Sequence, residues 1–182
     1  MLNVYLSWKR GFQLSYKRKM NAVGPYTLVF EYPRSVNFMC ERCAICCGDT
    51  EVRTRRILVL KLEAKRISKK TGKSIAEFAD RTVGSEPYAY EMRKDTNGKC
   101  VFLRSNECSI YGIRPLVCTF YPFELKPTGS NTFVFSYTDE CPFIGRGPEL
   151  KKEYFGKLFA RSKALIKRTS NKRAQDAPNL LD

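Results

Sequence analysis

Apolar and polar positions along the chain follow short patterns that predict several small helices and strands. Over 55–70, apolar residues alternate with basic ones in a broadly helical spacing, and Gly72 is expected to end this helix. Ser74 followed by Glu77 resembles a capping box, so a second short helix is expected over 74–81 with Ser74 as its N-cap. Both helices are expected to serve as scaffold.

Strand patterns fill the remaining segments. Residues 26–32 predict a strand closed by a proline, and 131–138 alternate aromatic and polar residues as a half-buried strand does. Residues 88–94 and 99–103 flank the pair Asn97-Gly98, which is typical of a tight hairpin turn. This hairpin places a cysteine on its return strand.

The segment 149–168 carries apolar residues on or near one face and lysines on the other, which predicts an amphipathic helix. A chain of 182 residues with 43% hydrophobic residues fits one domain with a real core. We therefore predict a single small α+β domain of short helices and β-hairpins. Its expected parts are a basic, aromatic-rich N-terminal segment (1–37), a cysteine-cluster core (38–145), a C-terminal amphipathic helix (146–170) and a flexible tail (171–182).

The chain is strongly basic, with 33 Lys and Arg against 18 Asp and Glu and a formal net charge of +15. This charge favours an acidic partner, such as RNA, DNA, an acidic protein or an anionic membrane surface. No apolar stretch is long enough for a transmembrane helix, and the N-terminus lacks the apolar core of a secretory signal, so we expect a cytoplasmic protein. Four aromatic residues could stack on nucleic-acid bases, although a solvated basic surface with buried aromatics is the favoured interpretation. They are Tyr5, Trp8, Phe12 and Tyr16.

Eight cysteines and no histidine define the candidate chemistry. In a reducing compartment, so many cysteines indicate metal ligands or redox groups more than disulfides. The absence of histidine excludes a Ser-His or Cys-His nucleophile pair, a Cys2His2 finger and a Rieske centre. Any metal would be held by thiolates, with or without a carboxylate.

Four of the cysteines fall within eight residues, which exceeds any packing need, whereas the others could individually be ordinary buried cysteines. The spacing Cys40-x2-Cys43-x2-Cys46 equals the first three ligands of a bacterial-ferredoxin run, whose fourth cysteine is followed by proline, as Cys141 is by Pro142. This pattern suggests one centre on these four cysteines, although the residue after Cys46 could replace it. A second four-thiolate site would then use Cys47, Cys100, Cys108 and Cys118.

The same residues resemble the CxxCxxCC cysteine-cluster family, whose members are described as zinc- or iron-chelating proteins and sometimes as iron–sulfur oxidoreductases. The ordered match spans roughly 38–142. It rests on Cys40-Glu-Arg-Cys-Ala-Ile-Cys-Cys47, on Cys108-Ser-Ile-Tyr-Gly-Ile-Arg-Pro-Leu-Val-Cys118, and on Tyr121-Pro-Phe123. The resemblance implies that the cysteines of these motifs and Cys100 are metal-site residues, with Cys141 as the later cysteine often seen in the family.

Some relatives contain this module in a lysine N-methylase acting on flagellin, which implies a candidate protein-modifying role. One position departs from the family, because Thr119 stands where a basic residue often follows the cysteine of the Arg-Pro segment. Arg114 is a candidate cofactor- or substrate-binding residue, since arginine is the usual partner of carboxylates and phosphates. Its favoured role is structural, offsetting thiolate charge while Pro115 aims Cys118.

Three functions therefore remain open. The chain could hold zinc or a [4Fe–4S] cluster as a chelating or structural site, or it could be an iron–sulfur oxidoreductase or methylase-like enzyme. The alternative is a zinc-stabilised nucleic-acid-binding module that uses the basic surface. The ferredoxin-like spacing and the Cys-Pro pair slightly favour iron–sulfur. Acidic residues beside the cysteines, namely Asp49, Glu51, Asp139 and Glu140, are expected at the surface or in contact with the ligands.

Overall fold

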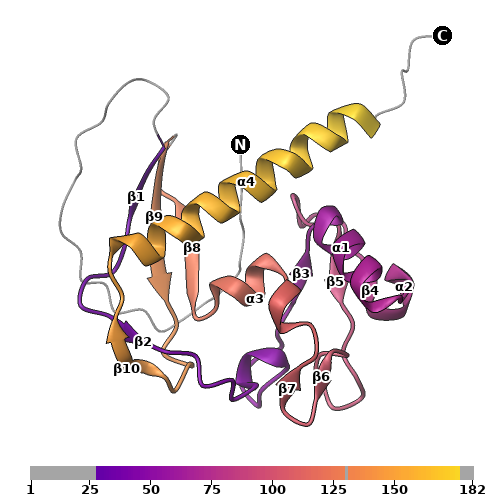
Figure 1. Cartoon of the computed structure of the whole chain (residues 1–182), viewed down its shortest axis with the longest axis horizontal. Coiled ribbons are helices and arrows are strands. Elements are labelled where there is room, and N and C mark those ends of the chain that lie inside the picture. The colour runs from indigo at the N-terminus through magenta and orange to yellow at the C-terminus, as the bar shows by residue number, and fades with distance from the viewer. Residues whose placement is uncertain (1–27, 130, 177–182) are drawn as a thin grey trace.

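The computed structural model describes residues 28–129 and 131–176, and it confirms a single small domain of the α+β class (Figure 1). Its helices are α1 (Lys61–Thr71), α2 (Ile75–Phe78), α3 (Leu116–Phe120) and α4 (Lys152–Asp176), with 3-10 turns at Ile45–Cys47 and Tyr111–Ile113. Its strands are β1 (Val29–Glu31), β2 (Asn37–Phe38), β3 (Leu58–Val59), β4 (Ala79–Arg81), β5 (Tyr90–Met92), β6 (Leu103–Arg104), β7 (Glu107–Cys108), β8 (Phe123–Pro127), β9 (Thr132–Tyr137) and β10 (Ile144–Glu149).

The strands form four small sheets. One has the order β1-β9-β8, with β1 parallel and β8 antiparallel to the central β9. A second has the order β3-β5-β4, and two-stranded sheets join β10 to β2 and β6 to β7. Strand β9 confirms the strand expected over 131–138, and its Phe135 is fully buried. Strand β1 confirms part of the strand expected over 26–32, whose first two residues lie outside the described ranges.

The helix expected over 55–70 is only partly correct. The helix α1 begins at Lys61, and the preceding residues form strand β3, which pairs with β5. Residues 57–60 are all buried, and alternate side chains enter different cores. Ile57 and Val59 join one core, whereas Leu58 joins the other. A strand buried on both faces is a continuous apolar run, which periodicity alone does not separate from a helix.

The second predicted helix is shorter than expected. Its capping box is confirmed, because the Ser74 amide donates to the Glu77 carboxylate at 2.7 Å. The helix ends at Phe78, however, and Ala79–Arg81 form β4 instead, which pairs with β5. Gly72 ends α1 as expected, in the left-handed conformation with φ 73°.

The predicted turn at Asn97-Gly98 is confirmed, but its flanking strands are shorter than expected. Only Tyr90–Met92 of the first is a strand, and the return side has an isolated bridge before β6 begins at Leu103. The Gly98 amide donates to the Asp95 carbonyl at 3.0 Å, and Lys94 bridges antiparallel to Cys100. Gly98 has a φ of 70°, a value that the glycine of such a turn adopts without strain. The hairpin therefore delivers Cys100 on its return segment.

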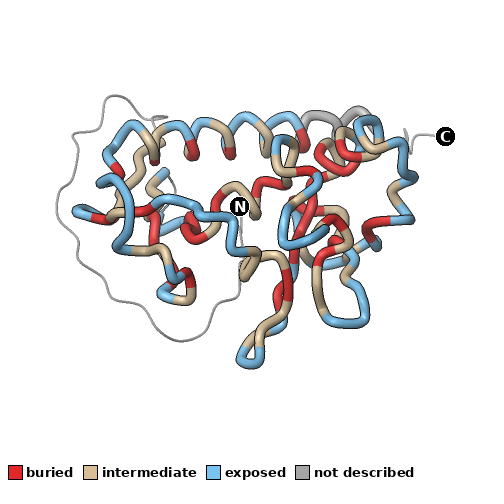
Figure 2. Tube along the Cα trace, turned by 60° about the horizontal axis from the view of Figure 1, so that its bottom comes forward, coloured by how far each residue is buried: buried red, intermediate tan, exposed pale blue. Residues whose placement is uncertain are grey.

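The long helix α4 lies across the whole molecule, over β8 and β9 at one end and beside α1 at the other (Figure 1). It begins and ends later than the pattern over 149–168 predicts. Its buried positions face the body of the protein and its exposed ones face outward (Figure 2). Phe155 anchors it, with its ring centroid 5.2 Å from those of Phe123 and Phe135. No helix in the described part of the chain combines the length and apolar character needed to span a membrane.

The described residues form two hydrophobic cores. The larger contains side chains of β8, β9, α3 and α4, and the smaller contains those of α1, α2 and β3–β5. Cys141 belongs to the larger core and Cys100 to the smaller one. The cysteines therefore pack against both hydrophobic cores.

Candidate metal centre

All eight cysteines line one cavity with a volume of about 300 Å³. They come from segments far apart in the sequence, and none of them forms a disulfide. Two are exposed, two are buried, and the others are half-buried. The structure therefore brings together the whole predicted set, which is Cys40, Cys43, Cys46, Cys47, Cys100, Cys108, Cys118 and Cys141.

The first cysteines lie on a sharply turning loop. Arg42 and Ala44 have φ values of 55° and 63°, in the left-handed region that non-glycine residues rarely adopt. The Cys47 amide then donates to the Ala44 carbonyl at 2.8 Å, which closes the 3-10 turn. These turns allow thiols separated by two intervening residues to line the same cavity.

Close backbone contact holds the Cys47 segment against the hairpin of Cys100. The Cys100 amide donates to the Cys47 carbonyl at 2.7 Å. Between them, a Cβ on Gly48 would lie only 2.6 Å from Lys99 Cδ and 2.7 Å from the Gly98 carbonyl oxygen. Only glycine permits this approach, so Gly48 fixes the separation of two candidate ligands.

Asp49 strengthens the same junction. Its carboxylate accepts hydrogen bonds from Lys94 Nζ at 2.7 and 2.8 Å and from the Arg55 amide at 2.7 Å. The lysine holds the pKa of Asp49 below its usual value, because it hydrogen-bonds to the charged form. Asp49 therefore contacts the segments of the ligands, as the sequence suggested, although no sequence signal identified Lys94 as its partner.

Cys108 lies on a hairpin that the sequence patterns did not predict. Strands β6 and β7 pair Leu103 with Cys108, and the two turn residues, Ser105 and Asn106, have φ values of 47° and 62°. Positive φ at both central positions is the geometry of a tight hairpin turn. Asn tolerates this conformation, and that preference was the available signal.

Cys118 lies on α3, directly after the Arg114-Pro115 pair. The Leu116 amide at the start of this short helix donates to the buried carboxylate of Glu63 at 2.8 Å. The other oxygen of Glu63 accepts the Leu60 amide at 3.2 Å, at the start of α1. Burial raises the pKa of Glu63. One carboxyl group thus fixes two helix starts and the position of Cys118.

The position of Cys141 is fixed by ion pairs of the preceding residue, Glu140. Glu140 pairs with Arg53 at 2.8 Å and with Arg55 at 2.7 Å. Arg55 is only 6% exposed and its guanidinium lies 5.1 Å from the centroid of the Tyr121 ring. These contacts tie the Cys141 segment to the residues that follow the cysteine run.

Electrostatic coupling divides the thiols into two neighbourhoods. Burial raises the pKa of Cys118 well above its usual value, and the nearby charges of Cys100, Cys46 and Cys108 add to this effect. Burial also raises the pKa of Cys141, with further contributions from Cys43, Cys46 and Cys40. Cys46 therefore lies close to both groups. A hydrogen bond between its thiol and Cys47 favours the protonated form and raises the pKa of Cys46.

The donor set fits a thiophilic metal. Burial raises the pKa of Cys100 to about 11, so metal binding must displace protons from thiols of this kind. Within the described ranges, no group of three or more Cys, Asp or Glu side chains has the geometry of a finished metal site. Thiols in one cavity, without histidine, match zinc and iron–sulfur chemistry.

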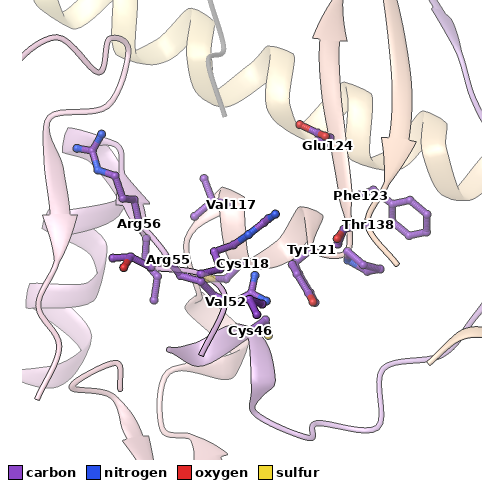
Figure 3. Close-up of a pocket in the computed structure, with 14 residues that line it drawn as sticks. Cys46, Val52, Arg55, Arg56, Val117, Cys118, Tyr121, Phe123, Glu124 and Thr138 are labelled. Carbon is purple, nitrogen blue, oxygen red and sulfur yellow. The ribbon is translucent and has the colours of Figure 1, made fainter. Parts of the chain in front are cut away.

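A second cavity, of about 230 Å³, shares two of these thiols with the first. Cys46 and Cys118 line both cavities, and Figure 3 shows them near Arg55, with Arg56 on one side and Glu124 on the other. Burial raises the pKa of Glu124. The arginines here are partnered by carboxylates, since Arg56 also pairs with Glu91 at 2.7 Å.

The other predicted site residues differ in where they lie. Arg114, the candidate cofactor-binding residue, lines the cysteine cavity. The aromatic residues of the proposed nucleic-acid surface, Tyr5, Trp8, Phe12 and Tyr16, lie outside the described residues.

Comparison with known proteins agrees with the constellation. The model of the CxxCxxCC family, described as "Putative zinc- or iron-chelating domain", matches residues 39–143, which is more than half of the chain. No curated protein and no solved structure matches the chain. The matched range contains every cysteine of the cavity. The chain therefore belongs to the CxxCxxCC family of zinc- or iron-chelating domains.

Proposed function

We propose that this metal-binding protein holds two thiolate-ligated centres, and that a [4Fe–4S] cluster occupies the one built on Cys40, Cys43, Cys46 and Cys141. The second centre uses Cys47, Cys100, Cys108 and Cys118 and would hold zinc or a further cluster. The observation that carries the proposal is the convergence of all eight cysteines on one cavity. The coupling of Cys141 to Cys40, Cys43 and Cys46 supports the proposed division.

The surrounding residues would prepare the cavity for such a centre. Apolar side chains, including Phe38, Ile57 and Ile110, line it beside the thiols and limit the access of water. The Cys47 carbonyl accepts the Cys100 amide, which keeps these two ligands in register. An iron–sulfur cluster would supply one-electron chemistry, so a redox or protein-modifying role is part of the proposal. Zinc would supply structure alone, because it has no redox chemistry.

The first experiment is anaerobic purification followed by measurement of iron, acid-labile sulfide, zinc and visible absorption. We expect iron and sulfide in equal amounts, with a broad visible band that bleaches on reduction. A colourless protein that contains stoichiometric zinc and no iron would disprove the cluster assignment. A protein without either metal would disprove the proposed function.

The division of the ligands is tested by single substitutions. C43S should abolish the first centre and C100S the second, while the other centre remains in each case. M92L is the matched control, because Met92 also lines the cavity and this exchange conserves volume. Full metal content in both cysteine variants would refute the ligand assignment. Loss of all metal in each would show that the thiols act as one unit.

Cys46 and Cys47 require their own comparison, because Cys46 lies close to both thiol groups. If Cys46 completes the first centre, C46S removes the cluster and C47S leaves it. The opposite result would exchange these two residues between the centres. Iron analysis of both variants, purified in parallel, distinguishes the assignments.

A further inference from the structure

Two cationic side chains in the cysteine cavity share one aromatic ring. The guanidinium carbon of Arg114 lies 3.8 Å from the centroid of the Tyr111 ring, and that of Arg42 lies 4.5 Å from it. Arg42 comes from the cysteine loop, whereas Tyr111 and Arg114 come from the segment before α3. All three line the cavity that contains the eight thiols. The ring therefore fixes two arginines from distant segments at one site.

These arginines keep hydrogen-bonding capacity that the protein itself does not use. Within the described part of the chain, neither Arg42 nor Arg114 forms an ion pair with a carboxylate. The Nε atom of Arg114 is buried and has no hydrogen-bond partner there. Glu41 also lines the cavity, but it is exposed and pairs with neither arginine. Stacking on a ring occupies the face of a guanidinium and leaves its N–H edge available.

Further positive charge lies behind Arg114. Arg66 donates to the carbonyl of Ile113 at 3.2 Å, beside Arg114 in the chain. The pKa of Arg161 is lowered by its burial, and the charges of Arg66 and Arg114 lower it further. Glu63 is the carboxylate that opposes this effect, and both of its oxygens already accept backbone amides. The region around Arg114 therefore has a surplus of positive charge that attracts an anion.

The cavity also indicates what is attached to the anion. Most of its lining is apolar, and the proposed metal centres would share its volume of about 300 Å³, so that only a small ligand fits beside them. Burial raises the pKa of Tyr154 to about 12, and both Arg114 and Cys40 lie close enough to influence it. Arg42 lies between Cys40 and Cys43 in the chain, and both arginines line the cavity together with these thiols. A small apolar molecule with one oxyanion fits this combination.

We infer that Arg42 and Arg114, held against Tyr111, bind the carboxylate or phosphate of a small amphiphilic ligand at the mouth of the cysteine cavity. The inference rests on the proposed function in that the remainder of the ligand would face the metal centre. Guanidinium groups bind both oxyanions in the same bidentate manner, so the shared chemistry defines the site. The sequence alone suggested Arg114 as a binding residue but gave no signal for Arg42 as its partner.

The test uses the purified full chain and two probes with the same alkyl group, butyl phosphate and butyrate. Calorimetric titration at constant ionic strength should detect one site, and the tighter probe identifies the preferred oxyanion. Butanol should not bind measurably, because it lacks the charge. R42Q and R114Q should each weaken binding about tenfold or more, as expected for a lost hydrogen bond to a charged group. R81Q is the control, since Arg81 is exposed on β4 and outside the cavity.

The role of the ring is tested with two substitutions of Tyr111. Y111F keeps the aromatic ring on which the two guanidinium groups stack and should bind the probes like the wild type. Y111L keeps both arginines but removes the ring, and it should bind the probes more weakly. Metal content is measured for every variant. Absence of binding to either oxyanion, or unchanged affinity in R42Q and R114Q, would overturn the inference. Loss of metal in these variants would also overturn it, since the arginines would then serve to offset thiolate charge. A wild type without metal would instead reject the proposed function. The titration would still show whether Arg42 and Arg114 bind the oxyanion.

Discussion

The amide of Leu116 donates a hydrogen bond of 2.8 Å to the buried carboxyl group of Glu63, across 53 residues of sequence. Because the same carboxyl group accepts the amide of Leu60, it closes the first turns of α1 and α3 together. Cys118 lies within α3, so its position depends on this contact. Glu63 therefore links the smaller core to a candidate metal ligand.

Replacing Glu63 with alanine should strongly destabilise the protein. Two buried amides would lose their acceptor, and we expect a cost of about 3 kcal/mol. Thermal unfolding of the metal-loaded protein measures the change. E77A is the matched control, because Glu77 caps α2 in the same way but is exposed, so its loss should be much smaller. Equal destabilisation by the two substitutions would contradict the role assigned to Glu63.

A methyl group on Gly48 should separate two candidate ligands. It would meet Lys99 and the Gly98 carbonyl at less than 3 Å, so the hairpin must move away from Cys47. We expect G48A to cost about 2 kcal/mol, as overpacking typically does, and to lower the occupancy of the second centre. Denaturant unfolding and metal analysis on the same sample report both effects.

The control for this substitution is G112A. A Cβ at Gly112 meets nothing within 4 Å, and this residue has no positive φ that would strain a side chain. The stability of G112A should remain within about 0.5 kcal/mol of the wild type. If G48A is equally mild, the close approach of the two segments is not a requirement for the site.

The sequence predicted best those features that depend on neighbouring residues. The Asn97-Gly98 turn, the Ser74 cap and the cysteine spacing are all local, and the structure contains each of them. Strand β3 was wrongly assigned to a helix, because an apolar run buried on both faces has no distinctive period. The hydrogen bonds of Glu63 could not be predicted, because its partners are backbone amides. Every residue except proline has such an amide, so no sequence pattern identifies which ones Glu63 would bind.

The pair of Asp80 and Arg93 should make stability depend on pH. Arg93 donates to Asp80 at 2.6 Å and thereby holds the pKa of this carboxyl group below its usual value. The stabilisation is therefore complete above the unfolded pKa of about 4 and is lost as the pH falls through the lower folded value. The stability difference between wild type and D80N should shrink over that acidic range. In an R93Q background, D80N should have little effect at any pH, and a persistent effect would argue against this pair.

Glu140 offers a way to disturb one of the two proposed centres without changing a thiol. Its carboxylate joins Arg53 and Arg55, and Arg55 is almost fully buried. E140Q would leave the Arg55 charge without its partner at Glu140, and we expect a loss of about 2 kcal/mol, because Glu140 itself is partly exposed. Since this residue precedes Cys141, the iron content of the first centre should fall more than the metal content of the second.

D139N is the matched control for this prediction, because Asp139 is the exposed neighbour on the other side of Glu140 in the chain. It changes the charge of the same segment by the same amount and should leave both centres loaded. Parallel metal analysis of the two variants separates a specific contact from a general charge effect. Equal loss of iron in both would mean that the segment's charge, and not the bridge to Arg53 and Arg55, governs Cys141. If iron is lost only in E140Q, the ion pairs of Glu140 with Arg53 and Arg55 position Cys141, because D139N retains these ion pairs.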